Sequence, residues 1–342
     1  MATAAIVVAP IVMASRAWLP PPANPEPQKR STNSIANDQY DLGRGYYRKT
    51  GDMIVAGNYY KAALAADPDF GLPKAGLATT LCYGGRDAFE YVFPTLSQGV
   101  AIAQSALKRD ANLSGAHLAL AWNAYVHEWN WKKAKEHFEK AIRCAPLNPE
   151  PHEWYGLFLS GIGKTNEAIR HLQVADDIAG SDAAVNGWYG QVLFSSRRYA
   201  EAIHKLQKAA AMPDKQDESR HLTWMLLWID RTDEAIEKWV DSFYGTKDAW
   251  ASDLKRVLHE QGQRAFWNKR LEGLRSRTSD PLILAEASSM AGHVNEALTF
   301  LEQAYREHHD FLGANLKNAP EWDILRDQPR FNQLLTKMKY PE

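Results

Sequence analysis

The sequence predicts an all-α fold, a solenoid built from tandem pairs of antiparallel helices. The first observation is a repeated pattern of a small, a large and a small residue, which returns every 34 residues from Ala134 to Ala168 and from Ala168 to Ala202. Residues four and seven apart share one helix face, so each copy forms a stripe that a second helix can approach closely. The second observation is that no alternating strand pattern of useful length competes. The clearest copies are Ala134, Phe138 and Ala141; Ala168, Leu172 and Ala175; and Ala202, Leu206 and Ala209.

The amino-terminal residues 1–38 differ in character from the rest of the chain. Residues 2–19 are mostly apolar, and a proline-rich linker follows them to about Asp38. Pro10 and Arg16 interrupt the apolar run, whereas a membrane span needs roughly 20 apolar residues. No basic residue precedes the run, although secretion signals normally begin with one. Membrane anchoring through residues 2–19, an export signal and an unstructured tail stay open, and so does the location: membrane-anchored, cytoplasmic or periplasmic.

Residues 39–310 are predicted to form about eight helix pairs. An insertion near residues 83–95 lengthens the second pair, and the third is one residue longer at the turn 129–131. Several second helices begin with Glu-Ala, as at Glu167, and the helix dipole favours a carboxylate in that first turn. Further copies of the pattern are Ala56, Tyr60 and Ala63; Ala235, Trp239 and Ser242; and Ala297, Leu301 and Ala304, with weaker ones at Gly99, Ala103 and Ala106 and around Ala265.

These spaced small and large residues resemble the tetratricopeptide repeat over about residues 39–310. The resemblance implies a right-handed superhelix whose first helices line a concave groove. A narrower resemblance rests on the stretches 127–131 and 320–335. Both are similar to the carboxy-terminal tetratricopeptide effector half of bacterial one-component regulators, in which a winged-helix DNA-binding domain comes first. That resemblance implies a role in signalling or transcriptional control, with residues 2–19 in place of the connecting segment.

Residues 311–342 are predicted to form a helical cap. A solenoid exposes an apolar face at its last repeat, which must be covered. Arg326 and Arg330 are interpreted as surface charges of the cap or as partners of Asp323 and Asp327. The apolar residues spaced to cover the last repeat are Trp322, Leu325, Phe331, Leu334 and Leu335.

The composition argues against several functions. The chain carries 40 basic and 41 acidic residues, and this balance predicts no direct binding to nucleic acid. The Gly-Lys-Thr at 163–165 lacks the earlier glycine and the strand of a phosphate-binding loop, so it is interpreted as a helix-to-helix turn. No His-Glu-x-x-His motif occurs, and Cys82 and Cys144 are interpreted as small buried hydrophobes. We therefore predict no catalytic residue, no metal site and no cofactor.

Tryptophans on the first helix of several predicted pairs suggest where a partner binds. Aromatic rings in a groove supply large, rigid contact area, which recognition surfaces favour. Packing between repeats explains the same residues equally well. The predicted function is a non-enzymatic scaffold that binds a protein or peptide, or a second copy of itself. The groove residues are Trp122, Glu153, Trp154, Trp188, Gln191, His221, Trp224 and Trp228.

A second hypothesis from a different class is a small-molecule site inside the superhelix, used for sensing or for catalysis. Helical folds host such sites, so the fold alone does not decide between the two hypotheses. The polar residues predicted to line it are His127, Glu128, His152, Glu153 and His221.

Overall fold

The computed structural model describes residues 29–83, 92–180, 182–211, 216–237 and 249–341, and across these ranges the chain forms helices and turns without a strand. This confirms the all-α class. The apolar run 2–19, most of the predicted insertion, and Trp239 with Ser242 lie outside the described residues. Within the described ranges, no helix combines the length and the apolar character that a membrane span requires.

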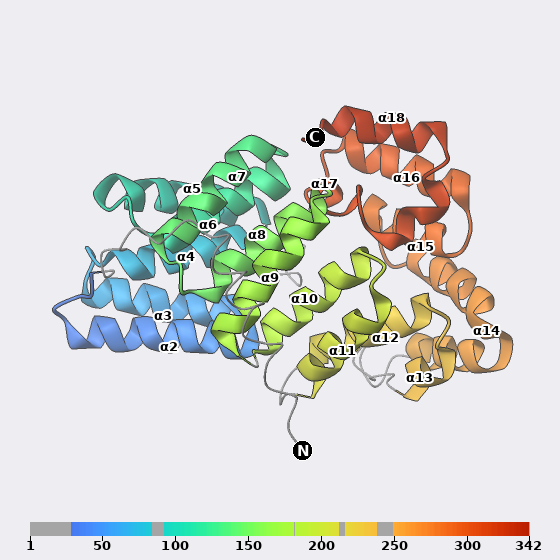
Figure 1. Ribbon diagram of the computed structural model, residues 1–342, viewed down its shortest axis with the longest axis horizontal. Coiled ribbons are helices and arrows are strands. Elements are labelled where there is room, and N and C mark those ends of the chain that lie inside the picture. The colour runs from blue at the N-terminus through green and yellow to red at the C-terminus, as the bar shows by residue number, and fades with distance from the viewer. Residues whose placement is uncertain (1–28, 84–91, 181, 212–215, 238–248, 342) are drawn as a thin grey trace, which may run out of the picture. The chain divides into compact units, whose positions relative to one another are not determined.

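Where the connections between them are described, the helices follow one another through short turns (Figure 1). The first half holds α2 (Ser34–Thr50), α3 (Met53–Ala66), α4 (Gly71–Tyr83), α5 (Val92–Arg109), α6 (Ser114–Trp122), the π-helical η1 (Asn123–His127), α7 (Trp131–Cys144), α8 (Pro149–Gly161) and α9 (Thr165–Ala179). The second half holds α10 (Ala183–Ser195), α11 (Tyr199–Ala210), α12 (Gln216–Trp228), α13 (Thr232–Glu237), α14 (Ala249–Arg275), α15 (Pro281–Met290), α16 (Val294–Arg306), α17 (Leu312–Asn315), the 3-10 helix η3 (Pro320–Leu325) and α18 (Pro329–Met338).

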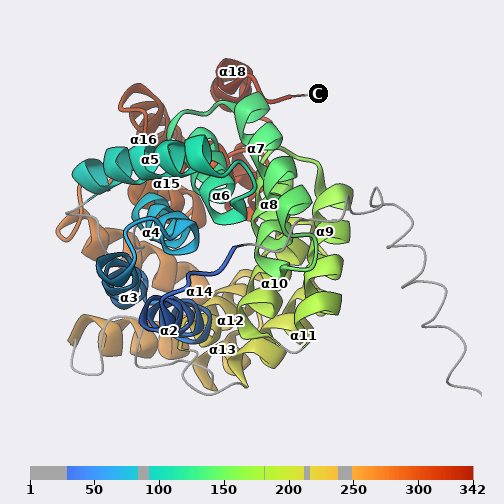
Figure 2. The same cartoon turned by 90° about the vertical axis from the view of Figure 1, so that its left-hand side faces the viewer.

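The chain divides into two compact units. Unit 1 comprises residues 1–123, 132–155 and 170–180, and unit 2 comprises 124–131, 156–169 and 181–342. In unit 1, α2, α3 and α4 pack in succession, as both views show (Figures 1 and 2). In unit 2, α10 packs on α11, α11 on α12, and α15 on α16.

The first described helix begins at Ser34, inside the segment predicted to be linker. Asn33 is the reason, because its side chain accepts hydrogen bonds from the backbone amides of Ile35 and Ala36. An asparagine in this capping position satisfies amides that the helix itself leaves unpaired. The helix therefore starts before residue 39, at which the repeat pattern predicts the first pair to begin.

The small-large-small stripes are buried as the repeat pattern predicts. Ala134, Phe138 and Ala141 have no exposed surface, and neither do their counterparts in α9 and α11, the stripes that begin at Ala168 and at Ala202. In unit 2, a methyl group added at Gly190 would lie 2.7 Å from a side-chain carbon of Leu206. A glycine is needed there because α10 and α11 approach each other so closely.

The third helix pair has one extra residue, and the sequence places this residue in the turn 129–131. In the structure the irregularity lies before that turn. The helix that begins as α6 ends in five π-helical residues, 123–127. Wider π-helical turns commonly accommodate a single inserted residue. After this turn Trp129 adopts a left-handed backbone, with φ 51°.

A second irregularity divides α14. Gly262 has φ 80° and ψ −179°, so the 27-residue segment consists of two helical arms joined by a break. The ammonium of Lys269 lies 3.6 Å from the Asp253 carboxylate, which brings the two arms side by side. The weak copy of the repeat around Ala265 therefore falls on the second arm of a helix pair.

The carboxy-terminal residues 311–341 pack on the last helix pair. Helix η3 contacts α15 and α16, and α18 contacts α16. Trp322, Leu325, Phe331 and Leu334 are buried there, and Leu335 is half-buried. Arg326 pairs with Asp323 at 2.6 Å, as expected. Arg330 pairs with Glu302 instead of Asp327, because α18 lies against α16.

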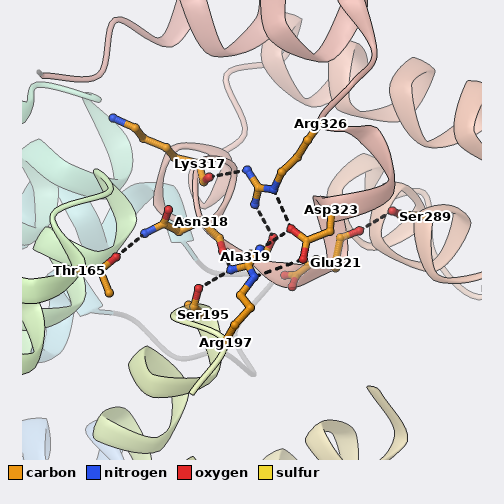
Figure 3. A network of polar contacts seen from close by, with 10 residues as sticks. All are labelled: Thr165, Ser195, Arg197, Ser289, Lys317, Asn318, Ala319, Glu321, Asp323 and Arg326. Atoms are coloured by element: carbon orange, nitrogen blue, oxygen red, sulfur yellow. Dashed lines mark hydrogen bonds and ion pairs between the residues drawn. The ribbon is translucent and has the colours of Figure 1, made fainter. Parts of the chain in front are cut away.

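The same carboxy-terminal residues also reach earlier turns of unit 2, which the sequence does not predict. Asn318 donates hydrogen bonds to the Ser160 carbonyl at 2.8 Å and to the Thr165 hydroxyl at 3.0 Å. Arg197, whose φ is 61°, donates to the Asn318 carbonyl at 2.6 Å and pairs with Asp323 (Figure 3). These contacts tie residues 317–326 to the turns that follow Gly161 and Ser195.

The turn between η1 and α7 and the first residue of α7 also contact the carboxy-terminal part of unit 2. The Trp131 indole donates to the Met338 carbonyl at 3.1 Å and stacks on Tyr340, with ring centroids 5.0 Å apart. Trp129 stacks on His308 with centroids 3.8 Å apart. We call these contacts, together with those of Asn318 and Arg197, the carboxy-terminal strap. Both stretches of the narrower resemblance, 127–131 and 320–335, therefore lie in unit 2.

Candidate functional site

The predicted groove residues fall into two groups. Trp122, Glu153 and Trp154 belong to unit 1, on α6 and α8. The others belong to unit 2, on α10 and α12, and are Trp188, Gln191, His221, Trp224 and Trp228.

In unit 1, two of the tryptophans form a packed cluster with Tyr83. The ring centroids of Trp122 and Trp154 are 4.6 Å apart, and Tyr83 lies 5.0 Å from the first and 4.4 Å from the second. Trp154 is buried and Trp122 is half-buried. Aromatic rings in tilted and edge-to-face contact add stability beyond their buried area. Trp154 thus packs inside the unit, whereas Trp122 is half-buried.

Beside this cluster, Glu153 is held by an ion pair. The Arg48 guanidinium donates to both carboxylate oxygens of Glu153, at 3.0 and 3.3 Å. Only 2% of the Glu153 side chain is exposed, against 24% for Arg48. The sequence predicts that Glu153 orients a bound peptide, and in the structure its carboxylate pairs with a cation on α2. Arg48 carries no local signal of this role because it lies 105 residues away.

Glu150 lies one helical turn before Glu153 on α8. Burial raises the pKa of the Glu150 carboxyl, and the positive charge of Arg48 opposes that rise. The pKa of Tyr47 is raised as well, first by burial and then by the charge of Glu150. Unit 1 therefore presents a polar and aromatic cluster whose charges are largely compensated internally.

This ion pair yields a prediction for stability. In Arg48→Met the buried Glu153 carboxylate loses this cation, and we expect a loss of about 3 kcal/mol, the lower end for a broken buried pair because Arg48 is partly exposed. The double variant Arg48→Met with Glu153→Gln removes both charges and should recover most of the loss. Urea unfolding of the three proteins measures both effects. Equal destabilisation of the single and double variants would contradict the assignment.

In unit 2, the predicted residues make two local contacts. The Gln191 amide lies 3.2 Å from a ring nitrogen of His221. Trp224 stacks on Trp267, with centroids 5.1 Å apart and planes at 15°, and the Arg270 guanidinium lies 4.5 Å above the Trp224 ring. A cation over an indole face is an attractive contact. Together these contacts hold Trp224 in a fixed orientation.

The remaining two tryptophans of unit 2 are half-buried. Trp228 contacts Phe194 edge-to-face, with centroids 6.3 Å apart. Trp188 lies on α10, three residues before Gln191. The sequence does not predict Trp267 or Arg270 as neighbours of Trp224, because both lie on α14, where the repeat pattern is weak.

The residues predicted for a small-molecule site are divided between the two units. His152 and Glu153 belong to unit 1, whereas His127, Glu128 and His221 belong to unit 2. His152 is buried against His171, with their Nδ1 atoms 3.0 Å apart. His127 lies 2.9 Å from the Asp310 carboxylate, within the region of the carboxy-terminal strap.

The histidine contact of His152 repeats one helix pair earlier. His117 and His137 place their Nδ1 atoms 3.1 Å apart, and the Nε2 of His117 lies 3.1 Å from the Ala111 carbonyl. Because a carbonyl only accepts, Nε2 of His117 carries the proton, and Nδ1–H of His137 then donates to Nδ1 of His117. One hydrogen bond therefore joins the two rings.

Other chemical sites find little support in the described part of the chain. Among those residues, no group of three or more metal-ligating side chains is assembled. The turn 161–165 connects α8 to α9, with Gly163 at φ 87°, and Asn318 bonds to Thr165 there. Cys82 is buried and Cys144 is half-buried, and both are free thiols.

Comparisons with known proteins were made on sequence and on structure. No protein-family model matches the chain, and no curated protein matches it. Among solved structures, a thermophilic tetratricopeptide protein from Thermus thermophilus is 20% identical, covers 56% of this chain and 99% of its own, and has a TM-score of 0.44.

Two further neighbours have the same repeat. YrrB, a tetratricopeptide protein with an unusual peptide-binding site, is 19% identical over 58% of this chain and 97% of its own, with a TM-score of 0.36. A tetratricopeptide repeat protein from Parabacteroides merdae is 12% identical over 89% and 99%, with a TM-score of 0.40. A likeness at these scores shows nothing about function. The helix pairs themselves identify the architecture as all-α and tetratricopeptide-like.

Proposed function

We propose that the chain is a non-enzymatic scaffold that binds a peptide or protein partner through the first helices of its repeats. The observation that carries the proposal is in unit 2, where Trp188, Trp224 and Trp228 are half-buried on α10 and α12. Half-buried tryptophans present apolar area at little entropic cost, and such residues dominate many interfaces. The contacts of Trp224 with Trp267 and Arg270 add preorganisation, which favours binding.

The test is a peptide-display selection against the full chain, followed by affinity measurements on the enriched peptides. We expect Trp188→Ala with Trp228→Ala to weaken binding about 30-fold, because two interface residues worth about 1 kcal/mol each together contribute about 2 kcal/mol. Tyr199→Ala is the matched control, a half-buried aromatic residue on the second helix α11 of the same unit. Peptides that bind the double variant and the parent equally, or no enrichment at all, would remove the proposal.

A narrower proposal is that the chain is the effector half of a winged-helix regulator, acting in signalling or transcription. The support is the sequence likeness of residues 127–131 and 320–335, both of which contribute to the carboxy-terminal strap. The reading frame upstream of Met1 tests it. A winged-helix segment encoded in frame would support the proposal, and a stop codon close before Met1 would contradict it.

A further inference from the structure

The outer face of α2 carries a row of exposed apolar side chains. Ile35 is 61% exposed, Leu42 51% and Tyr46 37%. Their spacings of seven and four place them on one side of the helix. The opposite side of α2 is buried through Ala36, Tyr40 and Gly43 against its own unit. We call Ile35, Leu42 and Tyr46 the α2 stripe.

The α2 stripe lies on the first repeat that the structure describes. A repeat face that no neighbouring repeat covers is normally polar, and the α2 stripe is apolar. At the other terminus of the repeats, residues 311–341 bury the last helix pair. Three large exposed apolar residues in a row are typical of an interaction surface.

Gly45 adds a second observation on the same face. A methyl group added there would meet nothing within 4 Å, so Gly45 is not required by packing within the chain. Glycine in the middle of a helix is destabilising compared with alanine. A glycine beside exposed apolar residues does allow another helix to approach closely. A leucine such as Leu42, presented by that second helix, would fill the space.

The charges beside the α2 stripe identify the partner. Asp38 and Lys49 are both exposed, and they flank the stripe on the same side, towards opposite ends of α2. If a second α2 packs antiparallel, Asp38 of each copy meets Lys49 of the other. The same register places Leu42 of each copy over Gly45 of the other, because both pairs are centred on the same point of the helix. A parallel arrangement would bring like charges together.

We infer that the α2 stripe binds a second copy of this chain, forming a two-fold symmetric dimer through antiparallel α2 helices. The surface is self-complementary in shape and in charge, as an isologous interface must be. A single helix face buries less than the roughly 800 Å² per partner of a standard interface. The dimer should therefore be weak and depend on concentration. This inference is independent of the proposed peptide groove.

Sedimentation equilibrium of the full chain, from micromolar to several hundred micromolar, tests the dimer. We expect the mean mass to rise with concentration for the parent and for Ile54→Asp, a control at a 76% exposed position on α3. Leu42→Asp should stay monomeric. Gly45→Gln should raise the melting temperature of the monomer and weaken the dimer. A parent that is monomeric throughout would overturn the inference.

A charge exchange tests the register. Asp38→Lys and Lys49→Asp should each weaken self-association, because each places like charges opposite one another at both symmetric contacts. Mixing the two single variants should restore dimers, since every contact then joins opposite charges. Failure of the mixture to associate better than either variant alone would exclude this register. If a peptide of residues 2–19 binds the monomeric parent but not Leu42→Asp, the face belongs to that segment and the dimer is wrong.

Discussion

Replacing Trp322 by alanine is expected to destabilise unit 2 by about 4 kcal/mol, in the range for large aromatic residues removed from a core. Trp322 is 1% exposed on η3, which packs on α15 and α16. The variant would leave a cavity and release residues 317–326 from the turns that they contact. Chemical unfolding measures the loss, and limited proteolysis after Arg306 should report the released segment.

Two variants of the same helix sharpen this test. The indole nitrogen of Trp322 has no hydrogen-bond partner among the described residues, so Trp322→Phe removes volume alone and should cost about 1 kcal/mol. Ile324→Ala, at a position 39% exposed on η3, should change stability by less than about 0.5 kcal/mol. A loss of similar size for all three variants would show that Trp322 does not anchor the segment.

Acidification is expected to destabilise unit 1 through the pair His152 and His171. Burial lowers the pKa of His152 to about 4 and that of His171 to about 3, the latter also through the charge of its partner. In the unfolded chain both imidazoles have the ordinary pKa near 6.5. Below that pH the unfolded state therefore binds protons at these two histidines that the folded state does not bind. The free energy of unfolding is therefore unaffected by these histidines above about pH 7 and decreases as the pH drops through about 6.5. It continues to decrease until the pH reaches the pKa values of the folded state.

Between pH 7 and pH 5 each histidine should contribute a loss of about 2 kcal/mol, or about 4 kcal/mol for the pair. Urea unfolding of the parent at both pH values, compared with His152→Asn plus His171→Gln, isolates this contribution. The double variant should lose about 4 kcal/mol less on acidification. His204→Gln, at an exposed position on α11, should keep the parental pH dependence. An unchanged pH dependence in the double variant would refute the assignment.

The sequence is sufficient for features that depend on local spacing. The period from Ala134 to Ala168 to Ala202 predicts both the helix pairs and the burial of their small residues, because helical faces follow from spacing alone. The sequence also shows that the third pair has one extra residue near 129–131, but it does not show where in the helix the chain accommodates it. The chain accommodates it in η1, where the turn widens, because the backbone can absorb one residue there without disturbing Trp131.

Contacts between distant residues cannot be derived in this way. No local pattern indicates that Arg48 pairs with Glu153 across 105 residues, and so the sequence alone places Glu153 in the groove. The same holds for Asn318 and Ser160, which are 158 residues apart. Periodicity shows which side of a helix faces inward, and the identity of the inward neighbour depends on tertiary packing.

The carboxy-terminal strap also has a consequence for synthesis of the protein on the ribosome. Repeat proteins can usually fold as each repeat emerges, because neighbouring repeats supply the contacts. Trp131, however, must wait for Met338, which follows 207 residues later. At roughly 5–20 residues per second, this interval is about 10–40 s. During that time the nascent chain exposes the surface around Trp129 and Trp131, where a chaperone would be expected to bind it.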